Sequence, residues 1–114
     1  MNYKISVVIR TYNEEKHLGE VLEQLENQSY KNYEVILVDS ESTDNTLHIA
    51  KKHDVKIVNI LKSDFNYSYA SNIGVKNSTG DIICFLSGHS VPAKETFLEN
   101  INKIFENEKI GGCY

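Results

Sequence analysis

The sequence lacks the residues that mark several classes of protein. It has no tryptophan, one proline and two cysteines in 114 residues. The two thiols, Cys84 inside an apolar run and Cys113 near the last residue, are far apart in the sequence, which argues against a disulfide framework or a metal site and favours a reducing compartment. We expect Cys84 to be a buried packing residue.

Long apolar runs and an excess of positive charge are also missing. No segment approaches the ~20 apolar residues of a membrane span, and the first residues lack the pattern of a signal peptide. The net charge is −4, with acidic and basic residues mixed along the chain, so no basic patch favours nucleic acid or an anionic membrane. These absences predict a cytoplasmic protein that has no nucleic-acid partner.

What the sequence does contain is organised around the segment 33–46. Residues 35–38 are all apolar, so both faces of this strand should be covered and the strand should be central. The run stops at Asp39, and the short polar side chains of residues 42–46 can cap a helix. In open parallel α/β sheets, ligands bind outside the carboxyl ends of the strands, so Asp39 lies where a ligand is expected.

Strands and helices are predicted to alternate along the rest of the chain. Further strands are predicted over 5–9, 55–60 and 82–86, with 55–60 nearer the sheet edge and 82–86 as buried as 35–38. Helices are predicted over about 14–27, over 46–53 and, after a loop over 62–69, around Ala70, Ile73 and Val75. The last predicted helix has an apolar stripe of Phe97, Leu98, Ile101, Ile104 and Phe105. The predicted fold class is α/β, a mostly parallel open sheet with helices on both faces, in one domain over 1–114.

Two expectations follow from the length. A doubly wound sheet would continue after the last predicted helix, and 114 residues are few for a complete enzyme, so we expect the chain to be the N-terminal part of a larger domain. An incomplete sheet would expose an apolar patch. Self-association into a homo-oligomer is therefore a second expectation.

Polar side chains follow the predicted strands at the edge where their carboxyl ends should meet. They are Thr11, Tyr12, Asn13 and Glu14 after the first strand, Asp39 after the second, and Ser87 and His89 after the fourth. An aromatic ring can stack on a nucleobase, and a carboxylate can accept from a ring N–H or a ribose hydroxyl. Neither GxGxxG nor GxxxxGK[ST] is present. A bound diphosphate would therefore need a divalent cation or nearby basic side chains.

Several of these residues have a structural interpretation as well. Asp44 fits a helix cap better than a ligand contact, and Glu14 fits a first-turn acid equally well. Asp39 could cap the turn that follows it. His89 could be a loop histidine rather than a metal ligand or a base. The aromatic residues of the loop 62–69 fit a packing lid as well as a binding surface.

Residues 5–46, ISVVIRTYNEEKHLGEVLEQLENQSYKNYEVILVDSESTDNT, carry a resemblance to a known family. They resemble the opening of family 2 glycosyltransferases of the GT-A fold, which have a VVIPTYNEE-type strand end and a VDDGSTDGT-type turn. The resemblance continues through Asn72-Ile73-Gly74, similar to the family's N-x-G helix, and through residues 80–86, similar to its GDyIxFLD strand. It covers essentially the whole chain, which corresponds to the Rossmann-like, nucleotide-sugar half of such an enzyme.

The resemblance implies inverting transfer of a sugar from a nucleotide-diphospho-sugar, UDP-type favoured, to a saccharide or lipid-linked acceptor in cell-surface polysaccharide synthesis. It implies that Thr11, Tyr12 and Glu14 line the nucleoside pocket and that Asp39 contacts the base. The family's general base, an acidic residue further along, has no counterpart in this chain. The catalytic residue is thus unknown, and we expect these residues alone to be inactive.

The sequence departs from the family pattern at Arg10, where proline is usual, and at Ser40-Glu41, where Asp-Gly is usual. Ser87-Gly88-His89 stands where Asp-x-Asp is common. Imidazole can ligate Mn²⁺ whereas Mg²⁺ prefers oxygen, so a divalent cation would be held weakly, with His89 as its ligand and Ser87 in a variant donor site.

Two functions other than sugar transfer fit the sequence. One is a non-catalytic nucleotide-binding or regulatory module, and the other is a nucleotidyltransferase-like domain. The absence of a glycine-rich basic loop counts against the second.

Overall fold

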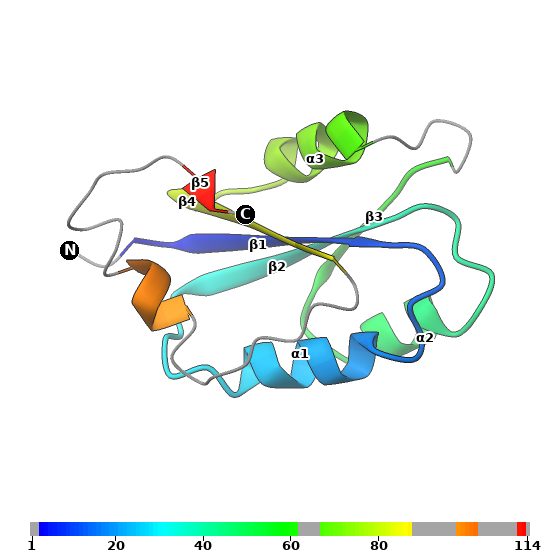
Figure 1. Cartoon of the computed structure of the whole chain (residues 1–114), viewed down its shortest axis with the longest axis horizontal. Coiled ribbons are helices and arrows are strands. Elements are labelled where there is room, and N and C mark those ends of the chain that lie inside the picture. Colours follow the sequence, from blue (N-terminus) through cyan, green and yellow to red (C-terminus); the bar gives the residue numbers. More distant parts are fainter. Residues whose placement is uncertain (1–2, 62–66, 88–97, 103–111, 114) are drawn as a thin grey trace.

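The computed structural model describes residues 3–61, 67–87, 98–102 and 112–113. Its elements are β1 (Ile5–Thr11), α1 (Leu18–Glu26), β2 (Tyr33–Asp39), α2 (Thr46–Ala50), β3 (Lys56–Asn59), α3 (Tyr67–Lys76), β4 (Ile82–Ser87) and β5 (Gly112–Cys113). The paired strands are all parallel, in the order β3-β2-β1-β4-β5. Figure 1 shows α1 and α2 on one face of the sheet and α3 on the other. The predicted fold class is confirmed, as is the place of β3 at the sheet edge.

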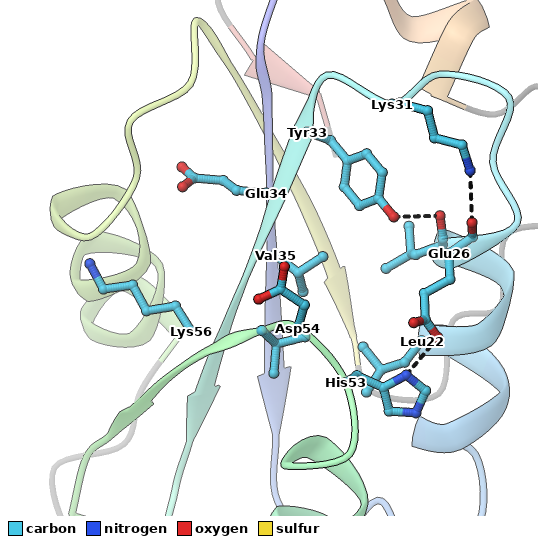
Figure 2. Close-up of a pocket in the computed structure, with 11 residues that line it drawn as sticks. Leu22, Glu26, Lys31, Tyr33, Glu34, Val35, His53, Asp54 and Lys56 are labelled. Carbon is cyan, nitrogen blue, oxygen red and sulfur yellow. Dashed lines mark hydrogen bonds and ion pairs between the residues drawn. The ribbon is translucent and has the colours of Figure 1, made fainter.

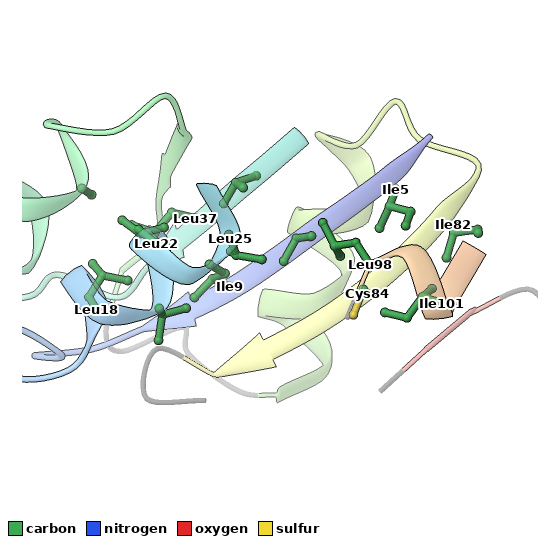
Figure 3. Close-up of a cluster of buried hydrophobic side chains, with 14 residues drawn as sticks. Ile5, Ile9, Leu18, Leu22, Leu25, Leu37, Ile82, Cys84, Leu98 and Ile101 are labelled. Carbon is green, nitrogen blue, oxygen red and sulfur yellow. The ribbon is translucent and has the colours of Figure 1, made fainter. Parts of the chain in front are cut away.

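Two apolar clusters, one on each face of the sheet, form the core. The larger joins α1 and the helical residues 98–102 to one face of β1, β2 and β4 (Figure 3). The smaller lies under α3 and contains Val8, Ile36, Val38, Ile60 and Ala70. Successive residues of a strand point to opposite faces, so β1 contributes Val7 and Ile9 to the larger cluster and Val8 to the smaller. This explains why Val7, Val8 and Ile9 of β1 and residues 35–38 of β2 form unbroken apolar runs.

The first helix begins later than its apolar spacing predicted. Asn13 has a φ of 51°, a left-handed conformation that a helix does not contain. The amide of Glu14 donates to Thr46 Oγ1 over 2.8 Å, so this backbone is held by the segment after β2. Helix α1 therefore begins at Leu18 rather than Glu14. Similarly, α2 ends at Ala50, short of the predicted residue 53.

Other boundaries and burial patterns also differ from the prediction. Helix α3 begins at Tyr67, so the predicted loop does not reach residue 69. Val75 is exposed, whereas Ala70 of the same helix is buried. In β4, Ile83 and Phe85 are only partly buried, because α3 packs mainly on β1 and β2. Cys84 is buried as predicted.

Buried polar side chains attach the helical residues 98–102 to the rest of the fold. The Leu98 amide donates to Gln28 Oε1 over 3.0 Å, and Gln28 is fully buried at the end of α1. Asn102 Oδ1 accepts from the Tyr3 amide at 2.8 Å and from the Tyr30 hydroxyl at 3.0 Å. Leu98 and Ile101 are buried as predicted. Phe97, Ile104 and Phe105 lie outside the described residues.

A carboxylate at the amino ends of the strands connects β1, β2 and the turn before β4. Glu34 Oε2 accepts from Ser6 Oγ at 2.5 Å and from the Thr79 amide at 2.6 Å, and Lys4 Nζ lies 3.7 Å from Oε1. Desolvation raises the pKa of Glu34, but these hydrogen bonds and the charge of Lys4 outweigh it and leave the pKa below its usual value. The ionised form therefore stabilises the fold.

Replacing Glu34 by glutamine is expected to lower the free energy of unfolding at neutral pH by about 1–2 kcal/mol. Because the folded-state pKa lies below the unfolded value of about 4.5, this contribution is present above that value and is lost as the pH falls through the folded-state pKa. Urea unfolding at neutral pH and in steps into acid measures both effects. Glu23→Gln, at an exposed position of α1, is the control. Identical pH profiles for E34Q and wild type would contradict this role of Glu34.

None of the helices in the described part of the chain has both the length and the apolar character that crossing a bilayer requires.

Candidate functional site

The carboxyl ends of β1, β2 and β4 meet at one edge of the sheet, as the sequence predicted. Thr11 lies opposite Asp39 in the β1–β2 register, and Arg10 lies opposite Ser87 in the β1–β4 register. The segment after β1 leads into α1, and the segment after β2 leads into α2, on the same face of the sheet (Figure 1). The predicted site residues Thr11, Tyr12, Glu14 and Asp39 are therefore neighbours.

Asp39 is fully buried and forms hydrogen bonds through both carboxylate oxygens. Oδ1 accepts from Thr11 Oγ1 at 2.7 Å and from Ser42 Oγ at 2.6 Å, and Oδ2 accepts from the Ser42 amide at 2.9 Å. The capping interpretation of Asp39 is thus confirmed. A carboxylate oxygen has two acceptor positions, so one on Oδ2 remains for another donor.

Asn13, one of the polar residues predicted at this edge, connects the two segments that form it, a role that the sequence did not predict. Its Oδ1 accepts from the Thr43 amide at 2.7 Å and from the Asp44 amide at 3.3 Å. Its own amide donates to Ser42 Oγ over 2.9 Å. The sequence signal that could have indicated this role is the residue type. Asparagine adopts a left-handed φ, here 51°, more readily than most residues.

Asp44 and Thr46 hold the beginning of the segment that leads into α1. Asp44 accepts from the amides of Thr46 at 2.9 Å and of Glu15 at 3.3 Å. Desolvation raises the pKa of Asp44, but hydrogen bonds from Thr46 and Glu15 leave it lower than usual. Asp44 is thus structural, as the sequence favoured, although the N-cap of α2 is Asn45; Asp44 binds the first residue of α2 and, across the edge, Glu15.

The surface of this edge combines an aromatic ring with polar groups. Tyr12 is 38% exposed, whereas Thr11 and Asp39 are buried beneath it. Glu14 is partly exposed, and Asn13 and Thr43 are exposed. An exposed ring beside hydroxyl, amide and carboxylate groups can bind a flat heterocycle through stacking and in-plane hydrogen bonds.

The predicted metal ligand is not part of the described structure. Ser87 ends β4 at this edge, its side chain is not described, and His89 lies outside the described residues. Within residues 3–61, 67–87, 98–102 and 112–113, no group of three or more His, Cys, Asp and Glu side chains could hold an ion. The described residues therefore do not form a metal site by themselves.

A cavity of about 560 Å³ lies at the opposite end of the strands, between α1 and the first residues of β2 and β3 (Figure 2). His53 Nδ1 lies 2.6 Å from Glu26 Oε1, Lys31 donates to the Glu26 carbonyl, and Tyr33 donates to the Leu25 carbonyl. Burial and the charges of Glu26 and Asp54 raise the pKa of Tyr33. His53, the last residue of the helix predicted over 46–53, follows α2 and connects to α1. Much of the polar lining is thus engaged within the fold.

Comparison with known sequences identifies the family to which this fold and edge belong. The profile of Glycosyl transferase family 2 matches residues 6–114. The chain belongs to glycosyltransferase family 2. It is 37% identical over 108 residues to a dolichyl N-acetyl-α-D-glucosaminyl phosphate 3-β-D-2,3-diacetamido-2,3-dideoxy-β-D-glucuronosyltransferase of Methanococcus voltae, covering 89% of this chain and 33% of that protein. The resemblance that residues 5–46 indicated is confirmed.

A second glycosyltransferase is similar both in sequence and in structure. The poly(ribitol-phosphate) β-N-acetylglucosaminyltransferase TarS of Staphylococcus aureus is 31% identical over 99 residues, covering 82% of this chain and 17% of TarS. The crystal structure of TarS 1-349 in complex with UDP-GlcNAc superposes with a TM-score of 0.80 at 26% identity, covering 93% of this chain and 32% of that chain. The chain thus spans a third or less of the length of these relatives.

Proposed function

We propose that this chain is the N-terminal, donor-binding part of an inverting glycosyltransferase. The enzyme would transfer a sugar from a nucleotide-diphospho-sugar, UDP-type favoured, to a saccharide or lipid-linked acceptor in cell-surface polysaccharide synthesis, on the cytoplasmic side of the membrane. The observation that carries this proposal is the convergence of Thr11, Tyr12, Glu14 and Asp39 on one sheet edge in a family 2 chain. The TarS complex with UDP-GlcNAc supports the donor class.

The proposed roles follow from exposure and hydrogen bonding. Tyr12, the exposed aromatic residue, stacks on the base or the ribose. Asp39 accepts from the base through the remaining position on Oδ2, and Thr11 holds the carboxylate in place through its 2.7 Å bond. Glu14 accepts from a ribose hydroxyl. No residue of this chain is assigned as the general base that deprotonates the acceptor.

We also propose that a divalent cation, Mn²⁺ or Mg²⁺, binds with the diphosphate and that His89 is one of its ligands. Ser87 would then contribute to the donor site at the end of β4. An imidazole nitrogen suits Mn²⁺ better than Mg²⁺, which prefers oxygen. Mn²⁺ is therefore the better probe of this proposal.

Calorimetric titration of the chain with UDP, GDP and dTDP tests the donor site. We expect saturable binding that is tightest for UDP, and we expect Tyr12→Ala to weaken it by about 1–3 kcal/mol because a stacking surface is lost. Tyr12→Phe keeps the ring and is the matched control. Adding Mn²⁺ should increase the affinity of the wild-type chain for UDP, but not that of the His89→Ala variant.

Each outcome has a distinct meaning. A folded chain that binds none of the nucleotides would contradict the donor-site proposal. Equal affinities of Tyr12→Ala, Tyr12→Phe and wild type would remove Tyr12 from the site. An Mn²⁺ effect that persists in His89→Ala would remove His89 from the metal site and leave the donor site intact.

A further inference from the structure

Arg10 lies at the same sheet edge as the proposed nucleoside site but on the other face of the sheet. Along β1, Val8 packs into the cluster under α3, and Arg10 is two residues further, so alternation places it on the α3 face. Its neighbours in register are Val38 of β2 and Ser87 of β4. The Nε atom of Arg10 is buried. The guanidinium stem therefore runs inside the fold beside the last residues of these strands.

Ser40, the residue after β2, lies at the same edge and is only 1% exposed. Its amide donates to the Thr11 carbonyl over 3.0 Å, so the strand geometry continues to this residue, and alternation places it on the same face as Ile36 and Val38. Its Oγ is buried and makes no hydrogen bond within the described part of the chain. Buried hydroxyls nearly always have a partner, so the partner of this one lies outside the described part of the chain, and a ligand can supply it.

Helix α3 covers the face of the sheet on which alternation places both residues. Ala70 packs in the cluster with Val8 and Val38, and Gly74, one turn later, lies against Val8. The helix thus runs from the carboxyl edge back across the sheet, with its first turn toward the carboxyl ends of the strands (Figure 1). The backbone amides of a helix's first turn favour negative charge.

The charges at this edge are distributed unevenly between its two sides. Among described residues 10–15, 39–46, 59–61 and 86–87, Arg10 is the one cation. The acids Glu14, Glu15, Glu41 and Asp44 belong to the segments that lead into α1 and α2, on the opposite side from α3. An anion at this edge is therefore repelled on the α1 side and attracted on the α3 side.

We propose that Arg10 and Ser40, beneath the first turn of α3, bind the diphosphate of the nucleotide sugar. The guanidinium donates to phosphate oxygens in its forked geometry, and the Ser40 hydroxyl donates a further hydrogen bond. The protein itself would thus supply positive charge that a metal ion alone would otherwise have to provide. This inference rests on the proposed donor site, and it assigns the base and the diphosphate to opposite faces of one sheet edge.

NMR chemical-shift titration of the chain with UDP and with uridine, both in EDTA, tests the inference. We expect wild type to bind UDP more tightly than uridine. Arg10→Gln should weaken UDP binding by about tenfold or more, because a charge-assisted contact is lost, and leave uridine binding unchanged. Arg10→Lys, which keeps the charge but not the forked donors, should lose less affinity for UDP than Arg10→Gln, and Ser40→Ala should show a smaller loss specific to UDP. Lys16→Gln, at an exposed position after the edge, is the charge-matched control.

The outcomes separate this inference from the proposal on which it rests. If wild type binds uridine and binds UDP no more tightly, the nucleoside site stands and the diphosphate role of Arg10 is overturned. A folded Arg10→Gln variant that loses affinity for both ligands equally, or that loses no more than Lys16→Gln, would also overturn it. A folded wild type that binds neither ligand would overturn the donor site and, with it, this inference.

Discussion

Replacing Asp39 by asparagine should lower the free energy of unfolding by about 2–4 kcal/mol and weaken the binding of uridine and UDP alike by about 1–3 kcal/mol. The carboxylate is fully buried and accepts from Thr11 and from both the hydroxyl and the amide of Ser42. An asparagine of the same shape carries no charge and has one acceptor oxygen instead of two, so either the Ser42 amide or the hydroxyls of Thr11 and Ser42 lose their acceptor. The turn at residues 39–42 would then be capped by fewer hydrogen bonds, and the proposed nucleoside pocket would lose its carboxylate acceptor.

The two effects are measured separately by urea unfolding and by titration with uridine. Glu41→Gln removes the same charge from the same turn at an exposed residue, whose φ of 55° glutamine tolerates as well as glutamate, and should change neither quantity much. Thr11→Val removes one of the three hydrogen bonds to Asp39 without removing a charge, and should give an intermediate loss of stability.

The uridine titration is made under conditions in which the unfolding curve shows that the Asp39→Asn variant is folded. Unchanged uridine affinity in the folded variant would remove Asp39 from the site and leave it a structural cap. A loss confined to UDP would contradict the assignment of Asp39 to the base, since Arg10 is the residue proposed for the diphosphate.

Replacing Gly74 by alanine should destabilise the chain by about 1–3 kcal/mol, although alanine favours a helix over glycine by about 1 kcal/mol. A Cβ at Gly74 would lie 2.3 Å from Val8 Cγ1 and 3.2 Å from Cγ2, well inside van der Waals contact. Val8 is fully buried in β1, between β2 and β4, and cannot move away. Helix α3 would therefore lift from the sheet and loosen the cluster beneath it.

A double-mutant cycle tests this explanation by urea unfolding. In a Val8→Ala background both Cγ atoms are gone, so Gly74→Ala should become neutral or stabilising, and the two substitutions should be strongly non-additive. Gly19→Ala in α1 is the matched control, because its Cβ would meet Ile49 Cγ2 at an ordinary 3.7 Å. Additive effects of Val8→Ala and Gly74→Ala would contradict the close-contact explanation.

Elements with an unbroken or strictly periodic apolar pattern could be predicted from sequence. The run at residues 35–38 predicted a central strand, and β2 is buried on both faces between β1 and β3. The spacing of Leu18, Val21, Leu22 and Leu25 predicted the buried face of α1. In both cases the local pattern and the tertiary burial agree, because a covered element needs apolar residues at each covered position.

Boundaries and partial burial could not be predicted in the same way. Helix α1 begins at Leu18 because Thr46 and Asp44, about 30 residues later in the chain, bind the backbone before it. Strand β4 has as apolar a sequence as β2, yet Ile83 and Phe85 are only partly buried, since the position of α3 over β1 and β2 decides which strands are covered. These outcomes depend on contacts between distant segments.

The sequence by itself determined the fold class, the family and the meeting of Thr11, Tyr12, Glu14 and Asp39 at one edge, because strand direction and residue order are enough to place strand ends together. The tertiary structure decided what each group at that edge is free to do. It shows Asp39 buried as the cap of its own turn, Asn13 connecting two segments, and Arg10 and Ser40 on the opposite face under α3. The physical reason is that hydrogen-bond partners, burial and the face on which a side chain lies are set by residues brought together only by folding.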